Sequence, residues 1–130
     1  MTFFKTTAIA GAMLAMAGCV TDTGSTGSAN FNGTYQLVDI DGLHLAGSAT
    51  LTIDGQAIHG EGPCNSYNSQ NNAVWPNVSL AGIAATRRAC LIEGGENTYF
   101  KALEQVTQAS LRDGTLELRG PGHAMRFTAE

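Results

Sequence analysis

Cysteines and histidines offer the widest range of chemistry in this chain of 130 residues. Cys64 and His59 lie five positions apart, so one hypothesis is a thiol–imidazole pair for nucleophilic catalysis. A second hypothesis is a metal site in which Cys64 and Cys90 join His59 or His123. Zinc sites commonly use close pairs such as C-x2-C or H-x3-H, and the sequence contains neither pair. The spacing therefore selects neither a zinc site nor a particular nucleophile and base.

The N-terminal segment carries the features of an export signal. Residues 6–17 form an uncharged, mostly apolar run, which is shorter than the roughly 20 residues that a bilayer span needs. Its length is typical of the apolar region of a signal peptide. The run ends in LAMAGC at residues 14–19, which resembles a bacterial lipobox, with Met16 in place of the more usual Leu.

The lipobox resemblance implies that residues 1–18 are a signal peptide and that Cys19 carries lipid on its sulfur and on its new amine. Several acyl chains together anchor a protein durably. Residues 19–30 are then the lipidated cysteine and a flexible tether rich in Thr, Ser and Gly. In Gram-negative lipoproteins, an Asp directly after the lipidated cysteine typically retains the protein at the inner membrane. Val20 stands at this position here, so the resemblance predicts a lipid anchor in the outer membrane, with the domain facing the periplasm.

Cys64 and Cys90 remain once Cys19 is assigned to lipid. Two remaining cysteines in an exported protein most simply form one disulfide. The chain-entropy model gives about 3.5 kcal/mol for closing a loop of about 27 residues. An oxidised Cys64 could not act as a nucleophile.

The charged side chains do not form a recognisable catalytic set. Asp39, Asp41 and Asp54 fall in or beside expected turns, so nothing selects an acid–base pair among them. Arg87 and Arg88 could contact an anionic lipid or a partner, although such a pair is most often a solvated edge. We therefore expect no catalytic residues, no metal site and no cofactor, and predict that the protein is not an enzyme.

Composition excludes several classes of protein. Seven Lys and Arg face eleven Asp and Glu, which gives a net charge of −4 and no basic surplus for binding nucleic acid. Hydrophobic residues make up 43% of the chain, which is too many for a disordered protein. The length allows one domain, which we place at residues 31–130.

Hydrophobic alternation predicts mostly strands in that domain. Short strands are expected at residues 34–40, 49–53, 57–59, 78–85, 110–119 and around Met125 and Phe127. Asp54-Gly55 predicts a hairpin turn, and the polar residues 65–72 are expected to be irregular. One helix is predicted near residues 94–108, from an apolar stripe. This order predicts the α+β class, with a small curled antiparallel sheet, a partial barrel, and the helix packed on it.

Two cysteine segments resemble the signatures of META domains. GPCNSY at residues 62–67 resembles the family's G-x-C-N-x-[YF] motif, and TRRAC at residues 86–90 resembles its T-x-x-A-C motif. The similarity covers residues 31–130, and further matching positions are Glu96, Phe100, Leu103, Leu116 and Leu118. Besides the two cysteines, the motif residues to which we assign structural roles are Gly62, Asn65, Tyr67 and Thr86.

The META resemblance implies a small α+β fold with a curled antiparallel sheet, and it supports the Cys64–Cys90 pairing. The family is associated with stress of the bacterial envelope and includes heat-shock lipoproteins, and it assigns no catalytic residues. We therefore expect a lipid-anchored, non-catalytic domain that binds an envelope protein or peptide. An alternative is a binder of a small apolar ligand or lipid inside the curled sheet, which requires an apolar cavity of about 300 Å³ or more.

Overall fold

The structure is a computed structural model that describes residues 30–130. The predicted signal peptide at residues 1–18, the lipidation site Cys19 and nearly all of the predicted tether at residues 19–30 lie outside the described residues. The described strands and helix are β1 (Gly33–Ile40), β2 (Thr50–Asp54), β3 (Ala57–Glu61), β4 (Ser66–Gln70), β5 (Ala84–Ala85), α1 (Glu96–Glu104), β6 (Gln108–Arg112), β7 (Thr115–Arg119) and β8 (Ala124–Ala129). None of the helical structure in residues 30–130 has the length and apolar character needed to span a bilayer.

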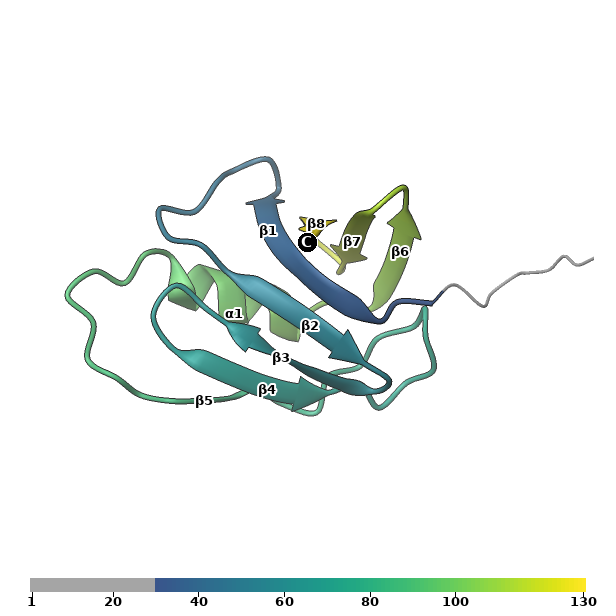
Figure 1. Ribbon diagram of the computed structural model, residues 1–130, viewed down its shortest axis with the longest axis horizontal. Helices are drawn as coiled ribbons and strands as arrows, with labels where there is room; N and C mark the ends of the chain where they lie inside the picture. Colours follow the sequence, from purple (N-terminus) through teal and green to yellow (C-terminus); the bar gives the residue numbers. More distant parts are fainter. Residues whose placement is uncertain (1–29) are drawn as a thin grey trace, which may run out of the picture.

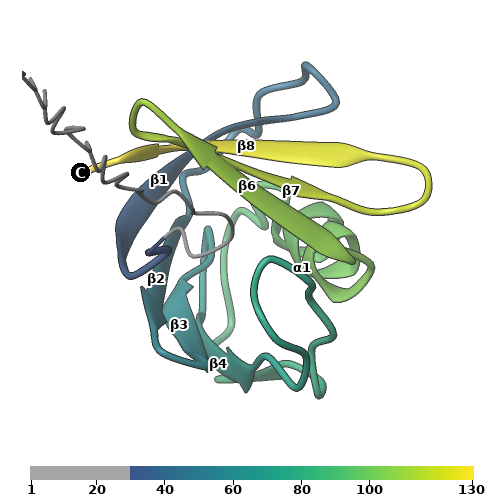
Figure 2. The same ribbon diagram turned by 90° about the vertical axis from the view of Figure 1, so that its right-hand side faces the viewer.

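The strands form one antiparallel sheet in the order β5-β4-β3-β2-β1-β8-β7-β6. The sheet curls, so that β6, β7 and β8 form one wall and β2, β3 and β4 form the other, with α1 against the concave side (Figures 1 and 2). The prediction of a curled antiparallel sheet with one helix is confirmed in this form. The class is mainly β with a single helix, which fits α+β loosely.

β1 turns the corner between the two walls. Its pairing with β8 shifts register between Leu37 and Asp39, as in a β-bulge. Tyr35 is buried before this shift, and Asp39 and Ile40 are buried after it. A bulge bends a strand and increases its twist, which explains why this strand carries apolar residues on both of its predicted faces.

The sheet is not closed, and the connection between β4 and β5 spans part of the gap. The N–H of Val78 donates to the carbonyl of Thr107 (2.9 Å), and the N–H of Ala109 on β6 donates to the carbonyl of Pro76 (2.8 Å). The N–H of Asn72 donates to Ser79 across the same connection (2.8 Å). These bonds cover part of the otherwise open edge of β6, where unpaired backbone groups invite association with other chains.

Large apolar side chains fill the space between the two walls. The rings of Tyr99 on α1 and Phe127 on β8 lie edge to face, with centroids 6.5 Å apart, and neither residue has exposed surface. The other largest buried apolar side chains are Leu51, Ile53, Leu103, Leu116 and Met125. Alternation along β7 and β8 places Leu116, Leu118, Met125 and Phe127 inward, as the sequence predicts.

Two predicted boundaries in the first half of the domain are wrong. The expected irregular stretch at residues 65–72 contains strand β4. Tyr67 is its only buried residue, so no hydrophobic alternation marks the strand in the sequence. The expected strand at residues 78–85 is reduced to β5, where Ala84 and Ala85 pair with β4. Gly82 has a φ of +118°, which interrupts an extended strand at that point.

The helix and the segment after it also differ from prediction. α1 covers residues 96–104 rather than 94–108. It starts later because Gly94 and Gly95 take φ values of +67° and +92°, and it ends before Gln105, whose φ of −104° and ψ of 2° are not helical. The expected strand at residues 110–119 is a hairpin of β6 and β7. Its turn has Asp113 and Gly114 at φ values of +50° and +79°, which is the sign that a tight two-residue hairpin turn requires.

Candidate functional site

The two cysteine segments meet at one corner of the domain, where the β3–β4 turn (residues 62–65) faces the start of α1. Glu96 is the first residue of α1 and is 8% exposed. Its carboxylate accepts hydrogen bonds from the backbone N–H groups of Cys64 (2.9 Å) and Asn65 (2.8 Å), and from Nδ2 of Asn65 (2.7 Å). One carboxylate therefore fixes both the backbone and a side chain of the turn, from a helix position that favours negative charge.

Asn65 extends this contact to the segment that follows β5. Its Oδ1 accepts hydrogen bonds from the hydroxyl of Thr86 (2.8 Å) and from the backbone N–H of Arg88 (2.7 Å). The guanidinium of Arg88 in turn donates to the carbonyl of Cys64. We call these five residues, Cys64, Asn65, Thr86, Arg88 and Glu96, the Glu96–Asn65 network. It joins three segments that are distant in sequence through the two ends of one amide side chain.

Glu96 is ionised more easily in the folded protein than in the unfolded chain. Burial alone raises the pKa of a carboxyl group, but the hydrogen bonds from Asn65 and Cys64 outweigh burial and lower the pKa of Glu96 below its usual value. The charge of Arg88 acts in the same direction. The network is therefore built around the charged form of this carboxyl.

Gly62 and Tyr67 explain the remaining positions of the first motif. A Cβ atom on Gly62 would lie 2.7 Å from Oε1 of Glu96 and 3.2 Å from the ring of Phe100, so the turn can approach α1 this closely only with glycine. The hydroxyl of Tyr67 lies 2.8 Å from the carbonyl of Thr50 and 2.7 Å from the hydroxyl of Tyr99. Tyr67 therefore links β4 to both β2 and α1.

A disulfide joins Cys64 to Cys90, with their Cα atoms 6.2 Å apart. Cys64 lies within the β3–β4 turn, and Cys90 lies in the exposed segment between β5 and α1. The bond ties this segment to the same turn that Glu96 holds from the other side. The disulfide and the network thus act on one corner of the structure.

The structure brings the residues of the two cysteine motifs together at or beside this corner, whereas the matching positions Leu116 and Leu118 lie in the core on β7. The sequence did not reveal that Glu96 accepts three hydrogen bonds, nor that Arg88 contributes through its backbone and its side chain. The available signal for Glu96 was an acidic residue at the start of an expected helix. A carboxylate at that place is commonly attributed to the helix dipole alone, so its partners across the domain were not foreseen.

The side chains considered for catalysis are distributed over several elements. His59, considered as a base for Cys64, is exposed on β3, and His123 contacts the carbonyl of Ala102 (2.8 Å). Asp39 pairs with the guanidinium of Arg126, which outweighs the effect of burial and lowers the pKa of this carboxyl. Over residues 30–130, no three His, Cys, Asp or Glu side chains converge in a way that could hold a metal ion.

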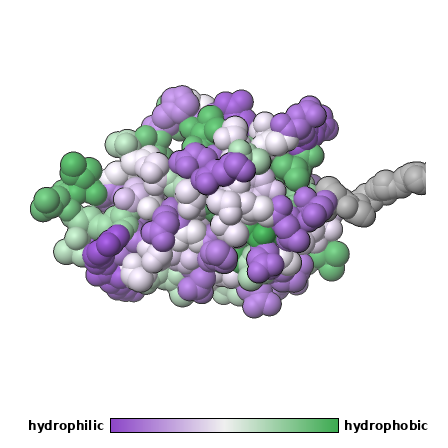
Figure 3. All heavy atoms as spheres, in the orientation of Figure 1, coloured by the Kyte–Doolittle hydropathy of each residue, from purple (hydrophilic) through white to green (hydrophobic). Residues whose placement is uncertain are grey.

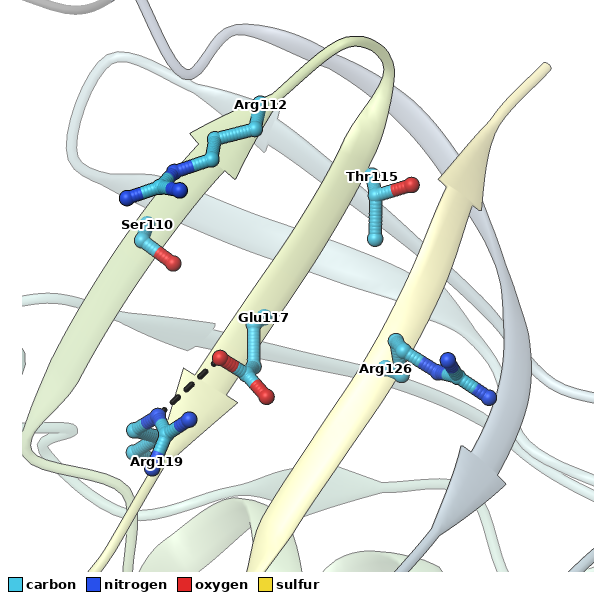
Figure 4. Close-up of a pocket in the computed structure, with 6 residues that line it drawn as sticks. All are labelled: Ser110, Arg112, Thr115, Glu117, Arg119 and Arg126. Carbon is cyan, nitrogen blue, oxygen red and sulfur yellow. Dashed lines mark hydrogen bonds and ion pairs between the residues drawn. The ribbon is translucent and has the colours of Figure 1, made fainter. Parts of the chain in front are cut away.

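A polar hollow of about 370 Å³ lies on the outer face of β6, β7 and β8 (Figure 4). Its lining residues are Ser110, Arg112, Thr115, Glu117, Arg119 and Arg126. Arg119 binds Glu117 (3.0 Å), and Arg126 points away from the hollow toward its partner Asp39. A second depression of about 300 Å³ lies where β4 meets β5. Both lie on the outside of the molecule rather than between its walls.

Comparison with known proteins identifies the class of this domain. The family model of the META domain matches residues 28–130, so the chain belongs to the META domain family. Its fold is similar to the NMR structure of the protein from Burkholderia xenovorans, with a TM-score of 0.61 and 20% sequence identity over 84% of this chain and 95% of that chain. At this identity the likeness concerns the fold alone. Comparison with curated proteins gives no match.

Replacing Glu96 by Gln tests the network at neutral pH. We expect Glu96→Gln to lower the free energy of unfolding by about 1–3 kcal/mol, because buried N–H donors lose a charged acceptor. Chemical denaturation measures the loss. Glu104→Gln, at an exposed position of the same helix, should change stability by less than about 0.5 kcal/mol. Equal effects of the two substitutions would contradict the network.

The cost of Glu96→Gln should also depend on pH. Because the folded pKa of Glu96 lies below the unfolded value of about 4.3, its stabilising effect is complete above that value. The effect is lost as pH falls through the folded pKa. The difference between the wild type and the variant should therefore shrink between about pH 5 and pH 2. A difference that stays constant over this interval would show that the charge of Glu96 contributes no stability.

Removing the disulfide should lower the free energy of unfolding of the domain. Replacing both Cys64 and Cys90 by Ala frees a crosslink between residues 26 positions apart. We expect a loss of about 2–5 kcal/mol in the free energy of unfolding, which is usual for a native disulfide in a small exported domain. Thiol titration of the denatured, unreduced wild-type protein provides the control. Two reactive thiols from these positions would refute the bond.

Proposed function

We propose that this protein is a lipid-anchored component of the bacterial envelope whose META domain binds another envelope protein or peptide without catalysing a reaction. The observation that carries the proposal is that the polar side chains of the family motifs form hydrogen bonds within the domain. Asn65, Tyr67, Thr86 and Glu96 bond to one another or to nearby backbone, so they build the scaffold rather than line a reaction site. A rigid scaffold of this kind suits a domain that presents a surface to a partner under envelope or heat stress.

The interior of the sheet offers less support for a small apolar ligand. Such a ligand needs a cavity of about 300 Å³ or more. Tyr99, Phe127 and Leu51 lie without exposed surface in the space between the walls, together with the neighbouring core side chains. We therefore place the binding surface on the outside of the domain.

The anchor is tested by Cys19→Ala. The variant should incorporate no labelled palmitate and should remain as precursor or leave the membrane fraction, because the proposed attachment depends on the lipid of Cys19. Fractionation at high salt removes proteins held only by charge. The variant with both Cys64 and Cys90 replaced by Ala is the matched control, and its palmitate labelling should equal that of the wild type. Membrane retention at high salt of Cys19→Ala protein that has lost residues 1–18 would overturn the proposed anchor.

A further inference from the structure

The acidic residues of this domain are absent from one long segment. No Asp or Glu occurs from Gly62 to Ile92, and Arg87 and Arg88 are the only charged side chains there. The chain as a whole carries an excess of acidic residues, so this segment differs in sign from the rest of the domain. We call the exposed side chains of residues 72–92 the acid-free flank. It ends at Glu93, an exposed residue whose carboxylate accepts hydrogen bonds from the N–H groups of Gly95 (3.1 Å) and Asn97 (2.7 Å) at the start of α1.

The acid-free flank begins where the chain enters the domain. Phe31 stacks on Trp75 with ring centroids 5.2 Å apart, so residues 30–31 lie beside the start of the flank. From there the chain runs along the β5 edge of the sheet to the opposite end of the molecule (Figure 1). A lipid tether that joins at Asn30 would therefore hold one end of the flank close to the membrane.

Large apolar side chains are exposed at both ends of this flank. Val74 is 78% exposed near the tether, and Leu91 and Ile92 are 104% and 76% exposed at the far end. Hydrophobic side chains gather visibly at that far end of the surface (Figure 3). Leu91 directly follows Cys90, which the disulfide fixes to the β3–β4 turn. The far end is thus held in place by a covalent bond rather than left as a free loop.

We propose that the acid-free flank lies on the anionic surface of the membrane that holds the anchor, with Leu91 and Ile92 entering the headgroup region and Arg87 facing lipid phosphates. This inference rests on the proposed lipid anchor. Exposed aliphatic side chains beside cationic ones are the combination that binds an anionic bilayer interface. The anchor raises the effective concentration of the surface, so even weak contacts of the flank suffice.

The length of the tether is compatible with this orientation. Residues 20–30, fully extended, reach at most about 36–40 Å. A folded domain of about 100 residues has a radius of gyration of about 13 Å. The domain can therefore lie along the bilayer with both ends of the flank in contact. In this orientation the outer face of β6, β7 and β8, on the opposite wall, stays open to the periplasm and to a protein partner.

Fluorescence quenching by brominated lipid tests the contact in the full lipidated chain. Leu91→Trp and Leu43→Trp are each made in a Trp75→Phe background and reconstituted in vesicles of equal parts phosphatidylglycerol and phosphatidylcholine. Leu43 is the matched control, since it is 72% exposed but lies outside the flank. We expect brominated lipid to reduce the emission of Leu91→Trp at least about twofold, because interfacial side chains lie about 5–10 Å deep. The emission of Leu43→Trp should change little.

The charge contribution is tested by Arg87→Ala with Lys101→Ala as its control, because Lys101 is exposed on α1 outside the flank. Arg87→Ala should weaken the quenching of Leu91→Trp, and Lys101→Ala should not. Flotation of the vesicles distinguishes failure of the lipid anchor from failure of the flank contact. Protein that does not float lacks the anchor, so the proposed function and the flank contact both fail. Protein that floats with equal, weak quenching at positions 91 and 43 overturns the flank contact alone.

Hydrogen exchange provides a second measurement without any substitution, which covers the case that Trp75→Phe does not fold. On anionic vesicles, the amides of residues 89–92 in the wild-type lipoprotein should exchange several-fold more slowly than on pure phosphatidylcholine. The exposed turn at Asp113 and Gly114, on the far wall, should exchange equally on both. Equal exchange of residues 89–92 on the two surfaces would also overturn the proposal. Protection of these amides by an added protein, but not by anionic lipid, would assign the flank to a protein partner instead.

Discussion

The carboxylate of Glu96 is buried among three N–H donors of one turn, and the corner of the domain depends on this contact. A buried charge is costly unless hydrogen bonds compensate for it, and here the compensation comes from the turn that also carries Cys64. Within residues 30–130, every buried side-chain nitrogen or oxygen has a hydrogen-bond partner. The position of the turn relative to α1, the course of the segment after β5 and the place of the disulfide all follow from satisfying this one group.

Much of the fold was accessible from the sequence because its signals are local. The Asp54-Gly55 pair predicts the turn that it forms, and the alternation of Met125 and Phe127 predicts the strand in which they lie. Asp113-Gly114 is the same kind of turn signal, and it marks the hairpin that a single predicted strand at residues 110–119 overlooked. β4 was missed because a strand with one buried residue, Tyr67, has almost no hydrophobic pattern.

The candidate site was accessible only in part because its contacts are long-range. The resemblance of two short segments to a family signature indicated which residues matter, but not what they touch. Glu96 lies more than thirty positions after Cys64 and Asn65, and no spacing rule predicts a hydrogen bond over that distance. The glycines at the start of α1 delay the helix so that Glu96 becomes its first residue. Its alignment with the turn is therefore a property of the folded chain.

These constraints also shape the proposed function. A motif whose polar groups are satisfied internally leaves recognition to the outer surfaces of the domain. Those surfaces differ in charge, since the flank that begins near Asn30 lacks acidic residues and the opposite wall carries paired Arg and acidic side chains. A domain tethered to a membrane can use such an asymmetry to orient itself, with one side for the bilayer and another for a partner. The network and the disulfide would then serve to hold the two sides in a fixed relation.

A double-mutant cycle between Glu96→Gln and Thr86→Val tests the central claim most directly, because the two side chains bind opposite ends of Asn65. If Asn65 transmits the constraint, loss of either partner frees its amide, and the second substitution then costs less than it does alone. The account predicts that the double variant loses less stability than the sum of the single losses, by about 0.5–3 kcal/mol. Losses that add within about 0.3 kcal/mol would show that the two contacts are independent and would contradict the account.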